Sequence, residues 1–273
     1  MGPGTGTGRK EGAFLVPHSE KGSPPRRFLM LQGPHGPFFG QLGRMLCAAG
    51  AEVWRVGFNR GDAFFWRGPG YIAYRDTPES WPAAFAQIAG EKRISDLVLY
   101  GEGRPIHAQA ISIAASKGIR VHVFEEGYFR PHWATLERNG VNAHSLLPRD
   151  PFWYLQAAQF LQQPDEARSF SSQTYARATR VAAYYGACLI NPVVFPEYRT
   201  HIPIHQITMA SGYVRRYWQM QRYEAESTSI IAQLLTSGSP FYLLPLQLNI
   251  DAHIRDHSGF TNMEEVLTYV VES

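Results

Sequence analysis

The sequence predicts an α/β protein whose first part is a Rossmann-like parallel sheet. Short apolar runs recur along the chain, and each is followed by a Gly- or Pro-containing loop and then by a segment with helical periodicity. The runs are continuously apolar, which is typical of strands buried on both faces. The composition, 44% hydrophobic and 18% charged, supplies enough apolar side chains for such a core. Repeated units of this kind specify a parallel sheet covered by helices on both faces.

Four strands are predicted in this part, at residues 27–32, 52–58, 96–100 and 120–124. A helix is expected from the loop GPHGP to about residue 49, where Gly50 ends it, and further helices are expected over 79–92 and 106–117. The stretch NRGDAFFWRGPG, which follows the second strand, is interpreted as a loop.

The pattern changes after Gly127. Asn139 and Gly140 stand between two short β-like runs, which is a hairpin signal. The elements expected after it are helices at 152–163, about 172–188 and about 206–236, a strand at 241–246 and a helix at 263–271. The predicted domains are a flexible tail at 1–25, a Rossmann-like domain at 26–150, a helical connecting region at 151–238 and the start of a second, incomplete nucleotide-binding α/β domain at 239–273.

Charge and cysteine content exclude several classes of protein. A net charge of +3 without a run of five Lys or Arg residues does not indicate nucleic-acid binding. Cys47 and Cys188 both lie in apolar stretches, which argues against a disulfide framework and favours a reducing, cytoplasmic compartment. No apolar stretch approaches the roughly 18 residues of a membrane span, and the N-terminus lacks the apolar core of a signal peptide. We therefore expect neither a secreted nor an integral membrane protein.

Candidate binding residues gather where the predicted strands end, because ligands of open parallel sheets bind outside the carboxyl ends of the strands. The loops at these ends are residues 32–37, 59–62, 101–105 and 125–131. The first loop precedes a helix, so its N–H groups, with Gly33 and Gly36, suit an anion; a simple tight turn is the alternative. Arg104 and Arg130 suit bidentate binding of a carboxylate or phosphate, or are ordinary surface charges.

Glu125 and Glu126 end the fourth predicted strand. Adjacent strand residues point to opposite sides, so we expect one of the two carboxylates to face a cleft. A fixed, partly desolvated carboxylate there can act as a nucleophile at a sugar's anomeric centre or as a general base. The alternative is a structural ion pair with Arg104 or Arg130.

Two other features have ordinary alternatives. His253 and His257 have the i, i+4 spacing of metal ligands on a helix, but no third ligand accompanies them, and a polar loop or helix start is expected instead. The aromatic and basic residues at 213–223 suit a lipid surface, or equally a helix with a core face and a solvated face.

Five motifs occur in order between about residue 27 and residue 273: FLMLQGPHGPFF, VGFNRGDAFFW, LVLYGEGRP, VHVFEEGYFRPHWATLERNGVN and PFYLLPLQLNIDAHIRDHS. In these motifs the chain resembles the capsule polysaccharide biosynthesis/export family. The resemblance implies a two-domain, GT-B-like glycosyltransferase that transfers 3-deoxy-D-manno-octulosonic acid (Kdo) from CMP-Kdo to a lysophosphatidylglycerol-type lipid acceptor at the cytoplasmic face of the inner membrane. Capsule assembly and export proteins are the implied partners, and no cofactor, metal or nucleic acid is expected.

The resemblance also implies site residues. A related family of Kdo transferases has Glu-Asp-Gly where this chain has Glu125, Glu126 and Gly127, and its Asp is the proposed catalytic carboxylate; the matching residue is Glu126, as nucleophile or base. The carboxylate of Kdo and the phosphate of CMP are anions for Arg104 and Arg130. Glu125 is also implied to bind substrate. The remaining implied substrate-binding residues are Gln32, Gly33 and Pro34 of the first loop, and Gln247 and Asp251 of the last motif.

Family members continue with further strands and a Lys-His-His-Pro type motif thought to bind the nucleotide, whereas this sequence ends at Ser273. We therefore expect a truncated member with impaired activity and a low melting temperature. The alternative to a transferase is a non-enzymatic component that binds the polysaccharide precursor or the export machinery. A third reading, a generic nucleotide-binding protein, predicts no preference for cytidine.

Overall fold

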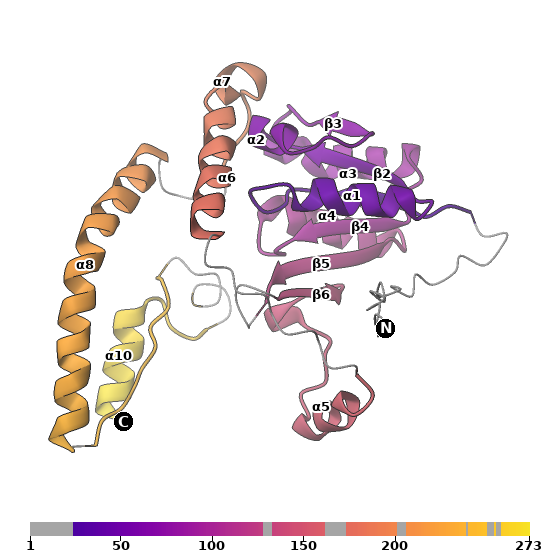
Figure 1. Cartoon of the computed structure of the whole chain (residues 1–273). Coiled ribbons are helices and arrows are strands. Elements are labelled where there is room, and N and C mark those ends of the chain that lie inside the picture. Colours follow the sequence, from indigo (N-terminus) through magenta and orange to yellow (C-terminus); the bar gives the residue numbers. More distant parts are fainter. Residues whose placement is uncertain are drawn as a thin grey trace, which may run out of the picture. The chain divides into compact units, whose positions relative to one another are not determined.

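In the computed structural model, a six-stranded sheet forms the centre of the first of two units (Figure 1). The structure describes residues 24–127, 133–161, 173–200, 206–238, 240–249, 254 and 258–273. The first unit comprises the described residues of 1–102 and 106–198, and the second comprises Gly103–Pro105 and the described residues of 199–273. Each unit is a compact group of residues in contact with one another, which is not the same as a domain. The expected domain boundaries at residues 150 and 238 therefore stay predictions.

The sheet has the strand order of a doubly wound fold. Its strands are β1 (Arg27–Met30), β2 (Glu52–Gly57), β3 (Tyr71–Ala73), β4 (Asp96–Tyr100), β5 (Arg120–Glu126) and β6 (Ala134–Arg138), in the order β3-β2-β1-β4-β5-β6. The first five are parallel, and β6 is antiparallel to β5. Leu29 of β1 is in register with Trp54 of β2 and Leu97 of β4. The order reverses between β1 and β4, which is where ligands of such sheets bind.

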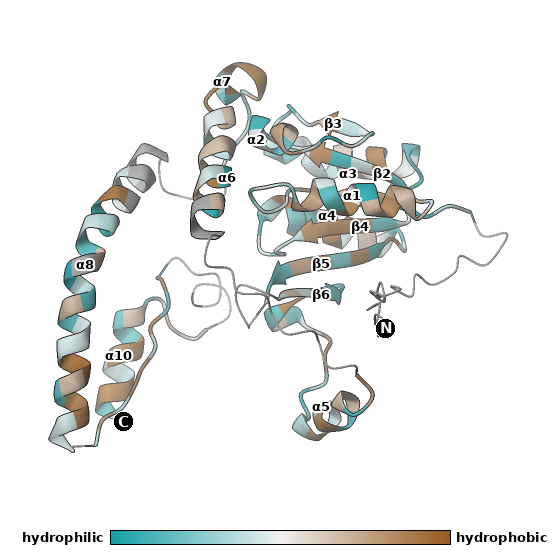
Figure 2. Ribbon diagram, in the orientation of Figure 1, coloured by the Kyte–Doolittle hydropathy of each residue, from teal (hydrophilic) through white to brown (hydrophobic). Residues whose placement is uncertain are grey.

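Helices cover both faces of this sheet. The helices outside the second unit are α1 (Phe38–Ala48), α2 (Arg60–Phe64), α3 (Trp81–Glu91), α4 (Pro105–Ser116), α5 (Pro151–Ala158), α6 (Gln173–Cys188) and α7 (Asn191–Val194), with 3₁₀ turns η1 (Pro78–Ser80) and η2 (Asn142–His144). Leu29 belongs to the larger core, which includes Trp81 of α3. Met30, the next residue, packs in a second core with Phe39 of α1. Alternate residues of β1 thus face different helices, which explains why the strand is apolar from Phe28 to Met30. Figure 2 shows hydrophobic residues along the central strands.

The predicted α/β class and parallel sheet are confirmed, but two local predictions for the first unit were wrong. The stretch interpreted as a loop after β2 contains α2 and leads into β3; both elements are shorter than the windows in which periodicity is visible. The Asn139-Gly140 pair is not a hairpin turn, since the chain reverses between the end of β5 at Glu126 and the start of β6 at Ala134. Asn139 instead ends β6 with a φ of +70°, a conformation that Asn tolerates.

Where the second unit is described, its long helices are α8 (Gln206–Ser237) and α10 (Met263–Glu272). The strand expected at 241–246 is wrong, because these residues have no regular structure and are largely exposed; Tyr242 is 99% exposed. A short apolar run forms a strand only where neighbouring strands complete its backbone hydrogen bonds. α10 begins as predicted, with the Asn262 side chain accepting a hydrogen bond from the Glu265 N–H. Among the described residues, no helix combines the length and hydrophobicity of a membrane span.

Candidate functional site

A hollow of about 400 Å³ lies at the carboxyl edge of the sheet in the first unit. Its wall combines the loop after β1, the ends of β4 and β5, the start of β6 and one face of α6. The lining residues are Pro34, His35, Gly36, Pro37, Phe38, Gln41, Tyr100, Glu126, Trp133, Ala134, Arg177 and Arg180. This is the edge at which the sequence predicted the binding residues to meet.

The loop after β1 is shaped by two glycines. A Cβ on Gly33 would lie 2.7 Å from the Phe39 ring, so only glycine fits without displacing that ring. Gly36 has a φ of +140°, which other residues rarely adopt. Between them His35 stacks on Tyr184 of α6, with ring centroids 4.0 Å apart. The loop therefore bends at these glycines and lies against α6.

The two carboxylates at the end of β5 have different surroundings. One Glu125 oxygen accepts a hydrogen bond from the Glu126 N–H at 2.9 Å. The Glu126 side chain is 38% exposed, lines the hollow and lies 3.6 Å from an Arg177 nitrogen. One carboxylate does face a concave site, as expected. The described ion-pair partner of Glu126 is Arg177, which the sequence analysis did not consider.

A buried polar network joins the loop after β1 to α2 and α6. Asp62 of α2 is 1% exposed, and its carboxylate accepts hydrogen bonds from Gln32 Nε2 at 3.2 Å and from Arg55 Nη2 at 3.3 Å. Asn59 caps α2 by accepting from the Asp62 N–H, and its Nδ2 donates to the Tyr184 hydroxyl at 2.8 Å. Gln32, Arg55 and Asn59 are each at most 2% exposed, so the whole network is withdrawn from solvent.

Ionisation in this network is suppressed. Burial, with the neighbouring Asp62 carboxylate, raises the pKa of the Tyr184 hydroxyl well above its usual range. Burial also raises the pKa of the Cys188 thiol, which lies 3.7 Å from Asn59 Oδ1. Both groups stay protonated near neutral pH, so the phenol serves as a hydrogen-bonding anchor and the thiol is not activated as a nucleophile. The network thus holds α6 at the carboxyl edge of the sheet.

The predicted site residues are distributed between the units. Pro34 and Glu126 line the hollow, Gly33 and Glu125 adjoin it, and the Gln32 side chain lies in the buried network. Arg104 and Gln247 belong to the second unit, where Gln247 is exposed. Other residues proposed from the sequence lie outside the described residues: Arg130, Asp251, His253 and His257. The roles of all of them in binding stay predictions.

Sequence reasoning missed the contribution of α6. Arg177 and Arg180 line the hollow, but they are single charges on a helix that was assigned only to a connecting region. One signal for its docking is present in the segment Asn59 to Asp62. A Cβ on Gly61 would lie 2.6 Å from the Tyr184 ring, so a capped turn with this glycine accommodates an aromatic side chain from elsewhere.

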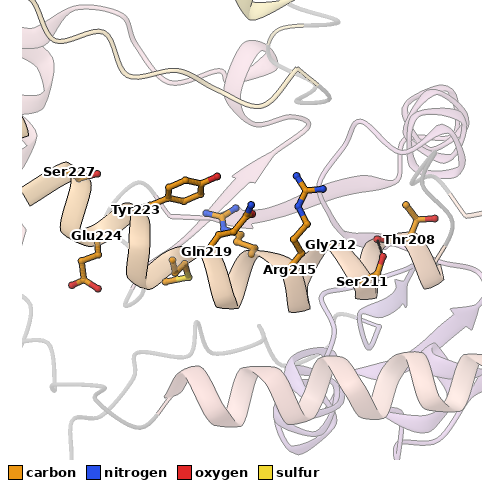
Figure 3. Close-up of a pocket in the computed structure, with 10 residues that line it drawn as sticks. Thr208, Ser211, Gly212, Arg215, Gln219, Tyr223, Glu224 and Ser227 are labelled. Atoms are coloured by element: carbon orange, nitrogen blue, oxygen red, sulfur yellow. Dashed lines mark hydrogen bonds between the residues drawn. The ribbon is translucent and has the colours of Figure 1, made fainter.

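A second hollow, of about 1080 Å³, lies along α8 in the second unit. All the residues that line it come from this one helix, among them Thr208, Arg215, Gln219 and Tyr223 (Figure 3). Tyr217 and Trp218 are 66% and 75% exposed, so these two aromatic residues of the segment at 213–223 do not form a core face within this unit. No group of three His, Cys, Asp or Glu residues suited to a metal ion occurs among the residues that the structure describes.

Comparisons with known proteins agree on one family. The family model for capsule polysaccharide biosynthesis protein matches residues 95–273. The chain is 33% identical over 249 residues to the capsule polysaccharide export protein KpsS of Escherichia coli, covering 91% of this chain and 64% of that protein. It is 31% identical over 258 residues to the capsule polysaccharide modification protein LipB of Neisseria meningitidis serogroup B, covering 90% of this chain and 60% of the relative. The chain therefore spans less than two thirds of the length of these relatives.

Proposed function

Because the chain belongs to the capsule polysaccharide biosynthesis protein family, we propose that it is a glycosyltransferase of capsule lipid-anchor assembly. It transfers Kdo from CMP-Kdo to a lysophosphatidylglycerol-type lipid, at the cytoplasmic face of the inner membrane, where capsule assembly and export proteins act on the product. Its sheet is the first domain of a GT-B-like enzyme, and residues 239–273 belong to the start of the second, nucleotide-binding domain. Neither a metal nor a cofactor takes part.

The observation that carries this proposal is the position of Glu126. Its carboxylate is partly exposed in a hollow at the reversal of strand order, which is the place where ligands bind to such sheets. A carboxylate beside an anomeric carbon supports glycosyl transfer either as base or as nucleophile. The proposed binding residues around it are Gln32, Gly33, Pro34, Arg104, Glu125, Arg130, Gln247 and Asp251.

As a base, Glu126 accepts the proton of the acceptor hydroxyl while that oxygen bonds to the anomeric carbon of Kdo. The bond from this carbon to the CMP phosphate oxygen breaks, and CMP leaves with the electron pair. As a nucleophile, Glu126 first displaces CMP, and the acceptor oxygen then displaces Glu126. Both routes need the carboxylate ionised, and both lose it in Glu126→Gln.

A second candidate function is non-enzymatic binding of the polysaccharide precursor for export. The observation that favours it is the similarity to the Escherichia coli relative KpsS, which is a capsule polysaccharide export protein. A binding component needs no reactive carboxylate, so it tolerates Glu126→Gln.

Kdo transfer by the Glu126→Gln variant separates the two candidates. The control is Glu91→Gln, the same chemical change at the exposed end of α3. For the transferase we expect the variant to lose at least about a hundredfold in rate, in line with the loss of a general base, while the control keeps its rate. Equal rates for the two variants would exclude Glu126 as the catalytic group.

A further inference from the structure

We propose that Arg177 and Arg180 of α6 bind an oxyanion of the donor substrate beside Glu126, either the carboxylate of the sugar acid or the phosphate of the nucleotide. This inference rests on the proposed function for the identity of the donor. Both arginines line the hollow that Glu126 lines, and they are three residues apart on one helix. Residues with this spacing share a helix face, so the two guanidinium groups are neighbours.

The buried network places this face of α6 at the hollow. Tyr184 is four residues after Arg180 and follows it along the same side of the helix. It is 5% exposed, accepts a hydrogen bond from Asn59 and stacks on His35. The arginines are therefore carried by a helix that is anchored one turn away from Arg180.

The charges of the hollow favour an anion. Glu126 is the acidic residue among those that line it, and it faces two arginines. Arg177 lies 3.6 Å from Glu126, but the two side chains are 79% and 38% exposed, and an ion pair of this exposure is weak. An incoming oxyanion thus competes readily with Glu126 for Arg177.

Arg180 is available for a ligand. Among the residues that the structure describes, it has no carboxylate partner. Its stem runs past Gly36, where an added Cβ would lie 3.5 Å from Arg180 Cδ. The planar guanidinium binds a carboxylate or phosphate through two parallel hydrogen bonds, which a lysine cannot reproduce. Arg180 is therefore the residue that determines affinity for the oxyanion, and Arg177 is shared between it and Glu126.

Calorimetric titration of the full chain with two probes tests this inference. Free Kdo carries only the carboxylate, and CMP carries only the phosphate. We expect Arg180→Gln to weaken the binding of one probe at least about tenfold, Arg180→Lys to restore part of it, and Arg222→Gln on α8 to leave it unchanged. Loss confined to Kdo assigns the carboxylate, and loss confined to CMP assigns the phosphate.

The inference is overturned if the chain binds neither probe, or if Arg177→Gln and Arg180→Gln bind both as the unsubstituted chain does. Circular dichroism of each variant verifies folding, which we expect to be unchanged because both side chains are exposed. The failure of this inference and the failure of the proposed function give different results. Binding that needs Arg180 without any Kdo transfer refutes the transferase alone, whereas transfer that is insensitive to Arg180→Gln refutes the oxyanion site alone.

Discussion

Asp62 is the residue whose replacement reports most directly on the packing of α6 and the loop after β1. Its carboxylate accepts hydrogen bonds from Gln32, Arg55 and the Phe58 N–H, and it is 1% exposed. Arg55 is 2% exposed, and within the described part of the chain its Nε and Nη1 atoms have no hydrogen-bond partner, so its charge is balanced mainly by Asp62. Asp62→Asn is nearly isosteric but leaves this guanidinium buried without a counter-charge.

Breaking a buried ion pair by removing one partner costs about 3 to 5 kcal/mol. This is a large fraction of the roughly 5 to 15 kcal/mol by which a domain is stable. For a unit of this size, about 1 kcal/mol corresponds to about 2 to 4 °C, so we expect the melting temperature of the first unit to fall by about 6 to 20 °C. Part of this loss should return in the double variant with Arg55→Met, because the unpaired charge is then gone.

Urea unfolding followed by circular dichroism measures the difference. The control is Asp76→Asn, the same substitution at an exposed position after β3, for which a change within about 0.5 kcal/mol is expected. If Asp62→Asn and Asp76→Asn unfold within about 1 kcal/mol of each other, the buried pair does not stabilise the unit, and the anchoring of α6 through this network must be abandoned.

Two further predictions concern the same unit. Burial raises the pKa of Asp96, but hydrogen bonds from His122, Arg26 and Arg120 outweigh burial and hold this pKa well below its usual range. The stabilisation of the fold by ionised Asp96 is therefore complete above the unfolded-state pKa of about 3.9 and is lost as the pH falls below that pKa. Asp96→Asn should lower the free energy of unfolding by about 2 to 4 kcal/mol at pH 7, and this loss should shrink below about pH 4 when it is measured by urea unfolding. A loss that stays constant with pH would contradict the assignment. Tyr184→Phe should lower the free energy of unfolding by about 1 to 3 kcal/mol, because it leaves Asn59 Nδ2 without its hydrogen-bond acceptor. The same variant should be cleaved faster at α6 in limited proteolysis. An unchanged cleavage rate would contradict the role of Tyr184 as the anchor of α6.

The sheet was predictable because its signals are local. Within the run at residues 27–32, the four central residues 28–31 are all apolar, and their alternate side chains do enter two different cores. Gly50 ends α1 as expected, with a φ of +85° and its N–H donating to the Cys47 carbonyl. Short elements such as α2 escape such patterns, because five residues span little more than one helical turn.

The candidate site was predictable only in part. Glu126 could be placed from the sequence because it ends a recognisable strand, and the position of a strand end in a parallel sheet is known in advance. Arg177 and Arg180 could not be placed at the hollow from the sequence. The pairing of Arg177 with Glu126 joins residues 51 positions apart on elements that do not share a sheet. The contact depends on Tyr184, Asn59 and Asp62 meeting in the folded state, and a single sequence gives no signal of that meeting.

The measurement that tests the central claim most directly is the mass of the lipid after the chain is incubated with CMP-Kdo and lysophosphatidylglycerol. Transfer predicts a lipid heavier by one Kdo residue, together with an equal amount of released CMP. A lipid of unchanged mass, with CMP-Kdo bound but intact, would contradict the transferase and would favour the precursor-binding role.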